Sequence, residues 1–525
     1  MDPLFNLVRL PTSFMDILSE NALLLVYGLL SLYIVRKVQL YARLRHISGP
    51  FWAGFSDWPH RKAMLQSDCE AWYAGISEEH GPMARVAPNV VMTTSPDVWA
   101  HVTNKPGYKR SDWFFKAMRS EHRRDNVFTQ TDNEKHDGRR KQLAPGVSGN
   151  PNMEMAVNEC LVELVHLIRS KYMSSDAEMI PMDLARKLQY FLLDSISAVT
   201  LGEALGSLQG DGDTHGYIKS TEDGLVMGTT ALALGFSWMC QVPLFGRLLT
   251  ASPKDEAGFG RFMAACFASV DERLANPTDE RSDALASFIR NGVTGDDARS
   301  EALIFMTVGA INPLAAMSGI LLHVISNARV YALLQREIDD AARHGKAPSA
   351  GKGLITSAQA KQLPYLQATI REGMRFWPPV VGLFPRRVPR GGDTVVVDGK
   401  PVFLPGGVCV GRSVSAMYRR KDIYGNDADS FRPERWFEPD AGKLADMVRA
   451  NEMLFNHGRT QCLGKAISQI EIGKTIFEAC RLSIHSSLLR NFGFALVNPI
   501  RPWKTRNTLG IFLTSDMWVH VTERL

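Results

Sequence analysis

The sequence lacks the features that divide a long chain into several units. It has no Pro/Gly/Ser-rich linker in its middle, no internal repeat and no low-complexity tract, so we expect one large domain despite the length of 525 residues. The formal net charge of +5 is small for this length and gives no reason to expect a nucleic-acid partner.

Cysteine patterns are also missing. The seven cysteines are scattered and odd in number, with no Cys-x-x-Cys pair and no Cys/His zinc spacing. This excludes a recognisable zinc site and a disulfide scaffold, and it fits free thiols in a reducing compartment.

Acidic residues are absent from one long apolar stretch. No Asp or Glu lies between Glu301 and Glu337, and the periodicity there predicts a helix over 298–326. Pro313 must remove a helix hydrogen bond and free a carbonyl, so we expect a local opening of that helix. Asn312 can donate and accept a hydrogen bond, but its amide is a poor proton shuttle.

Helical periodicity dominates the rest of the chain. We expect helices over 156–172, 183–201, 259–274, 298–326, 330–342, 364–376 and 466–482. Strand signals are few, at 83–86, 90–94, 394–397 and 401–403, and Asp398-Gly399 predicts a hairpin turn between the last two. The fold class is therefore mainly α: a large helical domain with a small β-sheet lobe.

The N-terminus carries an uncharged apolar stretch, residues 21–35. It is shorter than the ~20 residues that span a bilayer, but the apolar residues on either side make a tilted transmembrane helix plausible. It starts late and lacks a small-residue cleavage site, which argues against a removed signal peptide. An amphipathic surface helix is the alternative. We expect an anchor with a basic flank over 1–45, a domain over 46–525, and a hinge at 47–50.

Charge around this stretch is asymmetric. Acidic residues precede it and basic residues follow it: Asp2, Asp16 and Glu20, then Arg36, Lys37, Arg43 and Arg45. The positive-inside rule then predicts that the domain faces the cytosol.

One cysteine lies in a distinctive loop, Phe-Asn-His-Gly-Arg-Thr-Gln-Cys-Leu-Gly-Lys over 455–465, followed by a predicted helix. A Cys462 thiolate there would meet backbone N–H groups of the turn and the helix N-terminus. Gly458 and Gly464 would allow the backbone to approach a flat cofactor closely. A lone cysteine is also often a small buried hydrophobe, so the loop alone leaves both readings open.

Further motifs precede this loop. Glu372 and Arg375 stand three apart on a predicted helix and share a face. Phe-Arg-Pro-Glu-Arg-Trp follows at 431–436, with Arg435 inside it. His136 and Arg140 stand four apart and also share a face.

Taken together, these segments resemble the cytochrome P450 family, in order and spacing, over roughly residues 45–520. The cysteine loop resembles the family's haem-binding loop, Phe-x-x-Gly-x-Arg-x-Cys-x-Gly, and the matching residues are Phe455, Gly458, Cys462 and Gly464. Thr460 stands where the family usually has Arg or His, and Arg459 is one place early. Which cation near the loop meets a haem carboxylate is therefore left open.

The resemblance implies roles for the site residues. Cys462 would be the axial iron ligand of haem b (iron protoporphyrin IX). The residues that would meet the haem carboxylates are His136, Arg140, Arg386 and Arg459. Glu372, Arg375 and Arg435 would form the network that holds the cysteine loop against the core, a folding role rather than a catalytic one.

The resemblance also implies an activity. The expected protein is a haem-thiolate monooxygenase that hydroxylates or otherwise oxidises a small apolar molecule with O2. Electrons would come from NADPH through a separate NADPH-cytochrome reductase flavoprotein, with a cytochrome b-type protein as a further donor. The anchor and the loop resemble those of fungal secondary-metabolism members in the endoplasmic reticulum membrane. Substrate-facing walls are expected around 113–126, 225–238 and 380–384.

The central helix departs from the family, which usually carries Ala-Gly-x-Asp-Thr-Thr there. Ile311 stands at the acid position and Asn312 at the alcohol position. Protons could arrive through water held by Asn312 or by a substrate hydroxyl, or Thr307 or Ser318 could substitute. Alternatively the enzyme runs an oxidative coupling, an isomerisation or a dehydration without oxygen insertion. A non-catalytic haem sensor or carrier is a further alternative.

Overall fold

The computed structural model describes residues 12–122, 124–148, 150–175, 177–242, 245–246, 250–276, 281–348, 353–480 and 492–523. In its first half the longer helices are α1 (Thr12–Arg43), α2 (Trp58–Leu65), α3 (Cys69–His80), α4 (Pro96–Asn104), α6 (Asn133–Ser148), α7 (Met153–Lys171), α8 (Leu184–Leu201) and α10 (Tyr217–Leu234). In its second half they are α12 (Gly258–Ala275), α13 (Ala284–Arg290), α14 (Gly295–Ile325), α15 (Ala328–Arg343), α17 (Pro364–Phe376), α20 (Ala441–Glu452) and α21 (Lys465–Cys480). Short helices complete the set: α5 (Asp112–Phe115), α9 (Ser207–Gly210), α16 (Ser357–Lys361), α18 (Val414–Met417) and α19 (Lys421–Tyr424).

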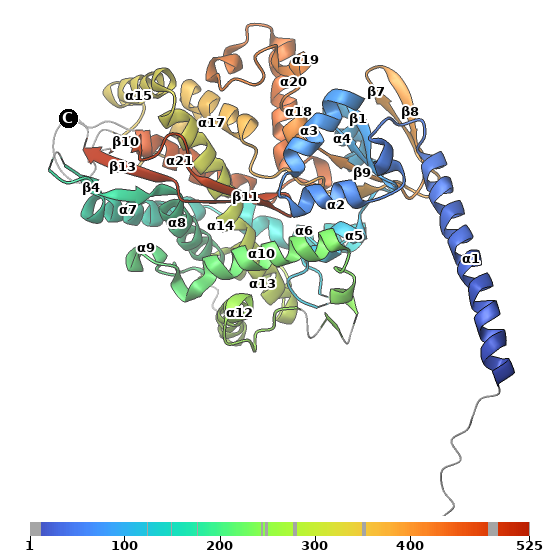
Figure 1. Ribbon diagram of the computed structural model, residues 1–525. Coiled ribbons are helices and arrows are strands. Elements are labelled where there is room, and N and C mark those ends of the chain that lie inside the picture. Colours follow the sequence, from blue (N-terminus) through green and yellow to red (C-terminus); the bar gives the residue numbers. More distant parts are fainter. Residues whose placement is uncertain are drawn as a thin grey trace, which may run out of the picture.

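Helix α14 runs through the middle of the body (Figure 1), with most of its residues buried. Its closest neighbour is α8. Gly309 makes this approach possible, because a Cβ there would lie 2.4 Å from Ile196 Cγ1. Pro313 sits inside this continuous helix. Its missing N–H removes one hydrogen bond, yet the helix continues to Ile325, so the expected opening does not interrupt the element.

The largest sheet has five strands in the order β1-β2-β9-β6-β3: β1 (Met83–Ala87), β2 (Val90–Thr93), β9 (Cys409–Arg412), β6 (Arg386–Arg387) and β3 (Lys109–Arg110). A second sheet has the order β10-β13-β4, with β5 also paired to β13: β10 (Phe492–Leu496), β13 (Trp518–Glu523), β4 (Met173–Ser174) and β5 (Pro181–Asp183). Two hairpins are separate: β7 (Asp393–Val397) with β8 (Lys400–Leu404), and β11 (Lys504–Thr508) with β12 (Ile511–Ser515).

The expected fold class, a helical body with a small sheet lobe, is confirmed. All the expected helices and strands occur within a few residues of the expected ends, and 364–376 coincides with α17. Residues 481–482 of the last expected helix lie outside the described residues. The hairpin turn is also present, with positive φ at Asp398 (47°) and Gly399 (76°), as a two-residue hairpin of this type requires.

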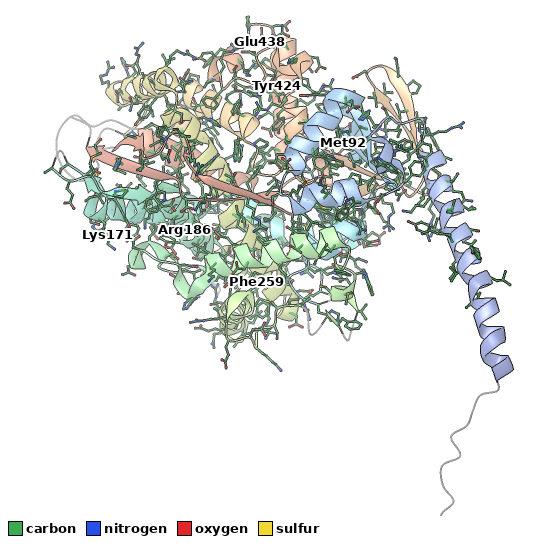
Figure 2. All side chains as sticks on the ribbon, in the orientation of Figure 1. Met92, Lys171, Arg186, Phe259, Tyr424 and Glu438 are labelled. Atoms are coloured by element: carbon green, nitrogen blue, oxygen red, sulfur yellow. The ribbon has the colours of Figure 1, made fainter. Side chains whose placement is uncertain are left out.

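Helix α1 projects alone from the body, near the β7–β8 hairpin (Figure 1). The side chains that are drawn on the outer part of α1 point away from the body (Figure 2), and no residue in the apolar window of the stretch Leu24–Arg43 is buried. It is consistent with a membrane anchor. Helix α14 is also long and apolar, but 72% of its apolar window is buried inside the domain, as expected for a core helix.

The base of α1 is packed rather than loose. Leu44 and Ile47 are buried, and the Arg85 N–H donates to the Ser48 carbonyl at 2.7 Å. A Cβ at Gly49 would lie 2.3 Å from the Arg85 carbonyl oxygen. The segment 47–50, expected to be a hinge, is therefore held against β1.

Candidate active site

A cavity of about 860 Å³ lies inside the domain. Its walls come from α10, α14, the segment 115–128 and the cysteine loop, and apolar side chains predominate. The stretches expected to face a substrate all contribute, through Phe115, Met118, Leu225, Leu234 and Phe384. The cavity is large enough for a bulky organic cofactor together with a small apolar molecule.

Cys462 forms part of this wall. Its side chain is exposed only in the sense that it faces the cavity, because protein surrounds the sulfur. Burial raises the pKa of the Cys462 thiol, while the N–H groups of Gly464 and Lys465 and the charge of Arg140 lower it. Burial outweighs these donors, so the pKa of the thiol stays raised in the protein alone, and the donors point at the position where a metal-bound sulfur would carry its charge.

Glycine is required sterically at one of the two loop positions. Gly458 has φ of 59°, and a Cβ there would lie 2.1 Å from Asn104 Oδ1. A Cβ at Gly464 would make only an ordinary van der Waals contact with Cys462 Sγ, at 3.8 Å. The Cys462 N–H donates to the Phe455 carbonyl at 2.7 Å, which closes the loop with the sulfur toward the cavity. Phe455 lines the same wall.

Basic residues gather at one edge of the cavity: Arg110, His136, Arg140, Arg386 and Arg412. The Arg140 guanidinium donates to the Gln461 carbonyl at 2.6 Å, beside the cysteine. His136 is buried and its ring lies 2.8 Å from Asp137 Oδ1. Burial, then the charge of Arg110, lowers its pKa to about 3, so this histidine is neutral and its single N–H donates to Asp137.

These residues fit a haem. Within the described ranges, none of the four arginines forms an ion pair with a carboxylate, and Arg110 Nε together with Arg412 Nε and Nη1 are buried without a hydrogen-bond partner. Buried guanidinium groups require anions. A flat group with a metal at its centre and carboxylates at its edge would meet the thiol and the cations together.

The sequence did not single out Arg110 and Arg412, and it placed Arg459 among the residues expected to meet the haem carboxylates. Arg459 lies one-third exposed, 3.7 Å from Asp137 Oδ2, beside a void of about 10 Å³ rather than in the main cavity. Its guanidinium already has a carboxylate. Arg110 and Arg412 give no local sequence signal, because only the pairing of β3, β6 and β9 brings them to the cavity.

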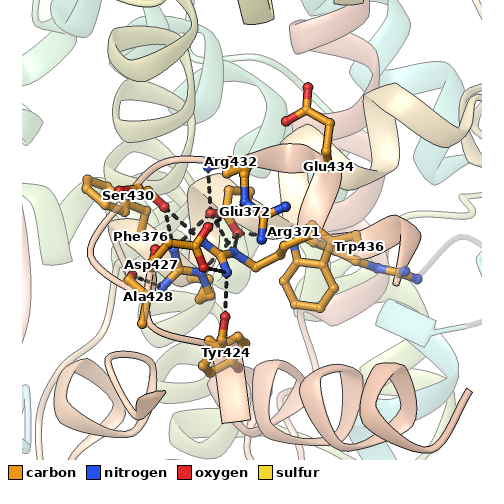
Figure 3. Close-up of polar contacts among 12 residues, drawn as sticks. Arg371, Glu372, Phe376, Tyr424, Asp427, Ala428, Ser430, Arg432, Glu434 and Trp436 are labelled. Atoms are coloured by element: carbon orange, nitrogen blue, oxygen red, sulfur yellow. Dashed lines mark hydrogen bonds and ion pairs between the residues drawn. The ribbon is translucent and has the colours of Figure 1, made fainter. Parts of the chain in front are cut away.

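Glu372 is the centre of a buried ion network (Figure 3). Arg375 approaches its carboxylate with two nitrogens, at 2.8 and 2.9 Å. Arg435 Nε lies 3.1 Å away, and the Trp436 indole N–H also donates at 3.1 Å. The Arg432 N–H donates at 2.8 Å. Glu372 is therefore fully paired, and the network ties α17 to the segment 424–436 that precedes the cysteine loop.

On α14 the cavity is lined by Asn312 but not by Ile311, which points into the core. The Asn312 side-chain oxygen is buried without a partner among the described residues. The Thr307 hydroxyl also faces the cavity, but it already donates to the Leu303 carbonyl at 2.8 Å. Ser318 is fully buried and lies outside the cavity lining. Asn312 is thus the polar group of α14 that is available to a bound molecule.

Glu301, the last acid before the apolar stretch of α14, is also buried. Its carboxylate accepts the Val127 N–H at 2.9 and 3.1 Å. Burial raises its pKa to about 8. Arg139 lies 3.5 Å from Glu301 and also pairs with Asp297. The hydrogen bonds from Val127 to Glu301 attach the cavity wall at Val127 to the N-terminal part of α14, and Arg139 pairs with the same carboxylate.

Comparison with known proteins gives a consistent picture. The family model for cytochrome P450 matches residues 64–515. Among curated proteins, the cytochrome P450 monooxygenase ABA1 of Pyricularia oryzae is 34% identical over 501 residues, covering 92% of this chain and 93% of the relative. The monooxygenase aba1 of Botryotinia fuckeliana is 32% identical over 454 residues (85% and 86%), and abl1 of Leptosphaeria maculans is 31% identical over 508 residues (94% and 85%).

Proposed function

The chain belongs to the cytochrome P450 family, and from this premise we propose that it oxidises a small apolar molecule of secondary metabolism, with Cys462 as the axial ligand of its haem. As a P450 monooxygenase it carries haem b with thiolate-ligated iron and takes electrons from NADPH through a reductase. When bound, the haem supplies oxygen activation, which the electron-rich sulfur favours.

One observation carries the proposal: the Cys462 sulfur faces a large apolar cavity whose edge holds buried arginines without carboxylate partners. Arg140 and Arg386 would hold the haem carboxylates. The negative charge of these carboxylates would favour a second proton on the His136 ring, which would then donate a hydrogen bond from Nε2. Phe455, Gly458 and Gly464 would shape the surface beneath the porphyrin. The remaining volume, between α10 and α14, would hold the substrate away from bulk water.

Asn312 would fix a water molecule or a substrate hydroxyl. Its amide can accept at Oδ1, which lacks a partner among the described residues, and donate at Nδ2. A water held there could pass a proton toward the reacting atoms, although the amide itself stays unionised. The substrate class is apolar because the lining offers few polar groups.

The test is spectroscopic. We expect the reduced, carbon-monoxide-bound wild type to show the thiolate-type absorption band, and Cys462→Ala to lose that band or the haem itself. Cys480→Ala, at the buried end of the same helix α21, is the matched control and should keep the band. A folded wild-type protein that stays colourless when supplied with hemin would overturn the proposal.

A second candidate, a haem-thiolate isomerase, dehydratase or oxidative-coupling enzyme, is favoured by one observation. Ile311 and Asn312 replace the acid and alcohol, and no acid of α14 other than the distant Glu301 follows the first turn. Turnover without NADPH and reductase identifies an isomerase or a dehydratase, because neither reaction needs external electrons. Oxidative coupling removes two hydrogens from the substrate and still needs O2 and NADPH, so it is recognised by a product that gains no label from 18O2.

The redox partner and location complete the proposal. The apolar helix α1 would anchor the protein in the endoplasmic reticulum membrane, with the domain in the cytosol beside a membrane-bound NADPH-cytochrome reductase and a cytochrome b-type donor. Support comes from the unburied apolar face of α1 and the basic residues that follow it. Fractionation with a protease-protection assay tests it, and digestion of the domain only after membrane rupture would contradict it.

A further inference from the structure

Arg412, which no sequence motif singled out, occupies the last position of β9 and lines the cavity. Its role follows from the sheet that carries it. Arg110 of β3 lies directly opposite Arg386 of β6, and Arg386 lies opposite Val410 of β9. Arg412, two residues after Val410, shares its face. Three arginines therefore stand on one face of three neighbouring strands.

Like charges across strands destabilise a sheet, so this arrangement needs an anion. Within the described part of the chain, no carboxylate pairs with any of the three. Arg412 is 2% exposed. Its guanidinium lies 5.5 Å from the Trp99 ring and 5.4 Å from the Phe384 ring. It donates only a long hydrogen bond, 3.3 Å, to the Leu454 carbonyl, and its Nε and Nη1 have no partner.

Arg412 lies next to the start of the cysteine loop. Leu454, its hydrogen-bond acceptor, directly precedes Phe455. Trp99, against which it packs, donates its indole N–H to Asn456 Oδ1 at 2.9 Å. The guanidinium of Arg386 lies 5.6 Å from the same ring. Arg412 thus reaches the cavity edge beside Arg386 and the start of the loop.

The cysteine loop itself supplies no cation at this edge of the cavity from the position two before the cysteine. Thr460 occupies the position two before the cysteine, where related loops usually have Arg or His, and its hydroxyl lies 3.3 Å from the His457 carbonyl. We propose that Arg412 binds a haem carboxylate in place of that missing arginine, so that the cation has moved from the loop to β9. The inference rests on the proposed haem site.

The test measures haem loss rather than turnover. Haem transfer from the purified holoenzyme to excess apomyoglobin is followed for the wild type, Arg412→Gln and Arg412→Lys. Removing one charge-assisted hydrogen bond predicts about tenfold faster loss for Arg412→Gln and a smaller change for Arg412→Lys. The propionate-bending band in the resonance Raman spectrum of the substrate-free enzyme should shift in Arg412→Gln.

Two further variants serve as a rescue and as a control. Adding Thr460→Arg to Arg412→Gln returns the cation to the loop and should restore most of the slow haem loss. Arg387→Gln changes the neighbouring arginine on the opposite face of β6, which pairs with Asp112 at 3.0 Å, and should behave as the wild type.

Defined outcomes overturn the inference. Wild-type haem loss and an unshifted propionate band in Arg412→Gln would mean that Arg412 serves the fold or an anionic substrate. Fast loss that Thr460→Arg does not slow would mean a structural role. If Arg412→Gln yields no soluble haemoprotein, Arg412→Lys decides by the same band and rate. A wild type without the thiolate-type band would instead refute the haem proposal itself.

Discussion

The chemistry of this cavity depends on single polar side chains that have no hydrogen-bond partner within the described part of the protein. The Asn312 oxygen and the Arg412 nitrogens are buried and unsatisfied among the described residues, which is costly in a folded protein unless a bound molecule completes them. Residues whose charges are fully paired, such as Glu372, stabilise the fold instead.

Replacing Asn312 by Ala should uncouple the enzyme. Haem content should stay near the wild-type level, because Asn312 lies on α14 and belongs neither to the cysteine loop nor to the arginines that would hold the haem carboxylates. The ratio of product formed to NADPH consumed should fall, because a water or hydroxyl loses its anchor. Parallel measurement of haem absorbance, NADPH oxidation and product checks this, with Ser318→Ala, buried on the same helix but outside the cavity, as control. Equal loss of haem and product would show that Asn312 is structural.

Glu301 predicts a pH dependence of stability. Its pKa, about 8 in the folded protein against an ordinary 4.5, means that the folded state binds a proton more tightly than the unfolded state. The resulting stabilisation is complete below about pH 4.5, declines as pH rises and is lost above about pH 8. Melting temperatures between pH 5.5 and 8.5 should therefore fall less steeply for Glu301→Gln, whose side-chain oxygen can still accept from Val127. An unchanged slope would contradict this.

At the scale of elements, the segment 424–436 is held by buried charge rather than by regular secondary structure. Arg375 donates to the carbonyls of Tyr418 and Ala428, at 2.8 and 2.7 Å, and Arg435 donates to that of Tyr424 at 2.6 Å. These hydrogen bonds fix the conformation of a segment that has no strand hydrogen bonds and that leads to the cysteine loop.

Glu372→Gln should damage this element severely. Removing one partner of a buried ion network costs about 3–5 kcal/mol, and we expect little haem-loaded protein. Glu434→Gln, in the same segment, breaks a pair with the exposed Arg329 and should cost at most about 1 kcal/mol. Chemical denaturation and the haem-to-protein absorbance ratio measure both. Similar losses in the two variants would show that burial does not set the cost.

Elements with a strong period could be predicted from the sequence, because a helix such as α17 has one buried face and clear ends at Pro364 and Trp377. The loop glycines and Cys462 were identified by pattern. The edge cations were only partly predictable: Arg110 and Arg412 reach the cavity through strand pairs that are 276 and 22–24 residues apart in sequence. Strands β10 to β13 were also missed. The partners in the β10–β13 pair lie 23–31 residues apart in sequence, whereas β11 and β12 form a local hairpin whose turn, Leu509-Gly510, carries no Asn-Gly or Asp-Gly signal.

For the whole molecule, the junction between anchor and domain decides how the enzyme can be shortened. Tyr41 stacks on Phe55 with ring centroids 4.6 Å apart, and the Arg85 guanidinium lies 4.7 Å from the Tyr41 ring. Arg43 and His46 reach the carbonyls of Gly406 and Phe403, each at 2.7 Å. The domain therefore begins structurally near Tyr41.

Deleting residues 1–36 should leave a haemoprotein with the melting temperature of the full chain, since the side chains that the structure describes between residues 22 and 36 are all exposed. Deleting 1–47 should lower that temperature, because it also removes the buried Leu44 and Ile47. Thermal melts of both proteins in detergent, followed by the Soret absorbance, check this. Equal melting temperatures would show that the junction contributes nothing.

The cross-strand arginines have a consequence for how the protein matures in the cell. Before a porphyrin binds, the repulsion between these arginines is not offset by an anion, and it destabilises the part of the sheet that carries them. Cellular abundance should then follow tetrapyrrole supply, with proteolysis removing copies made during scarcity.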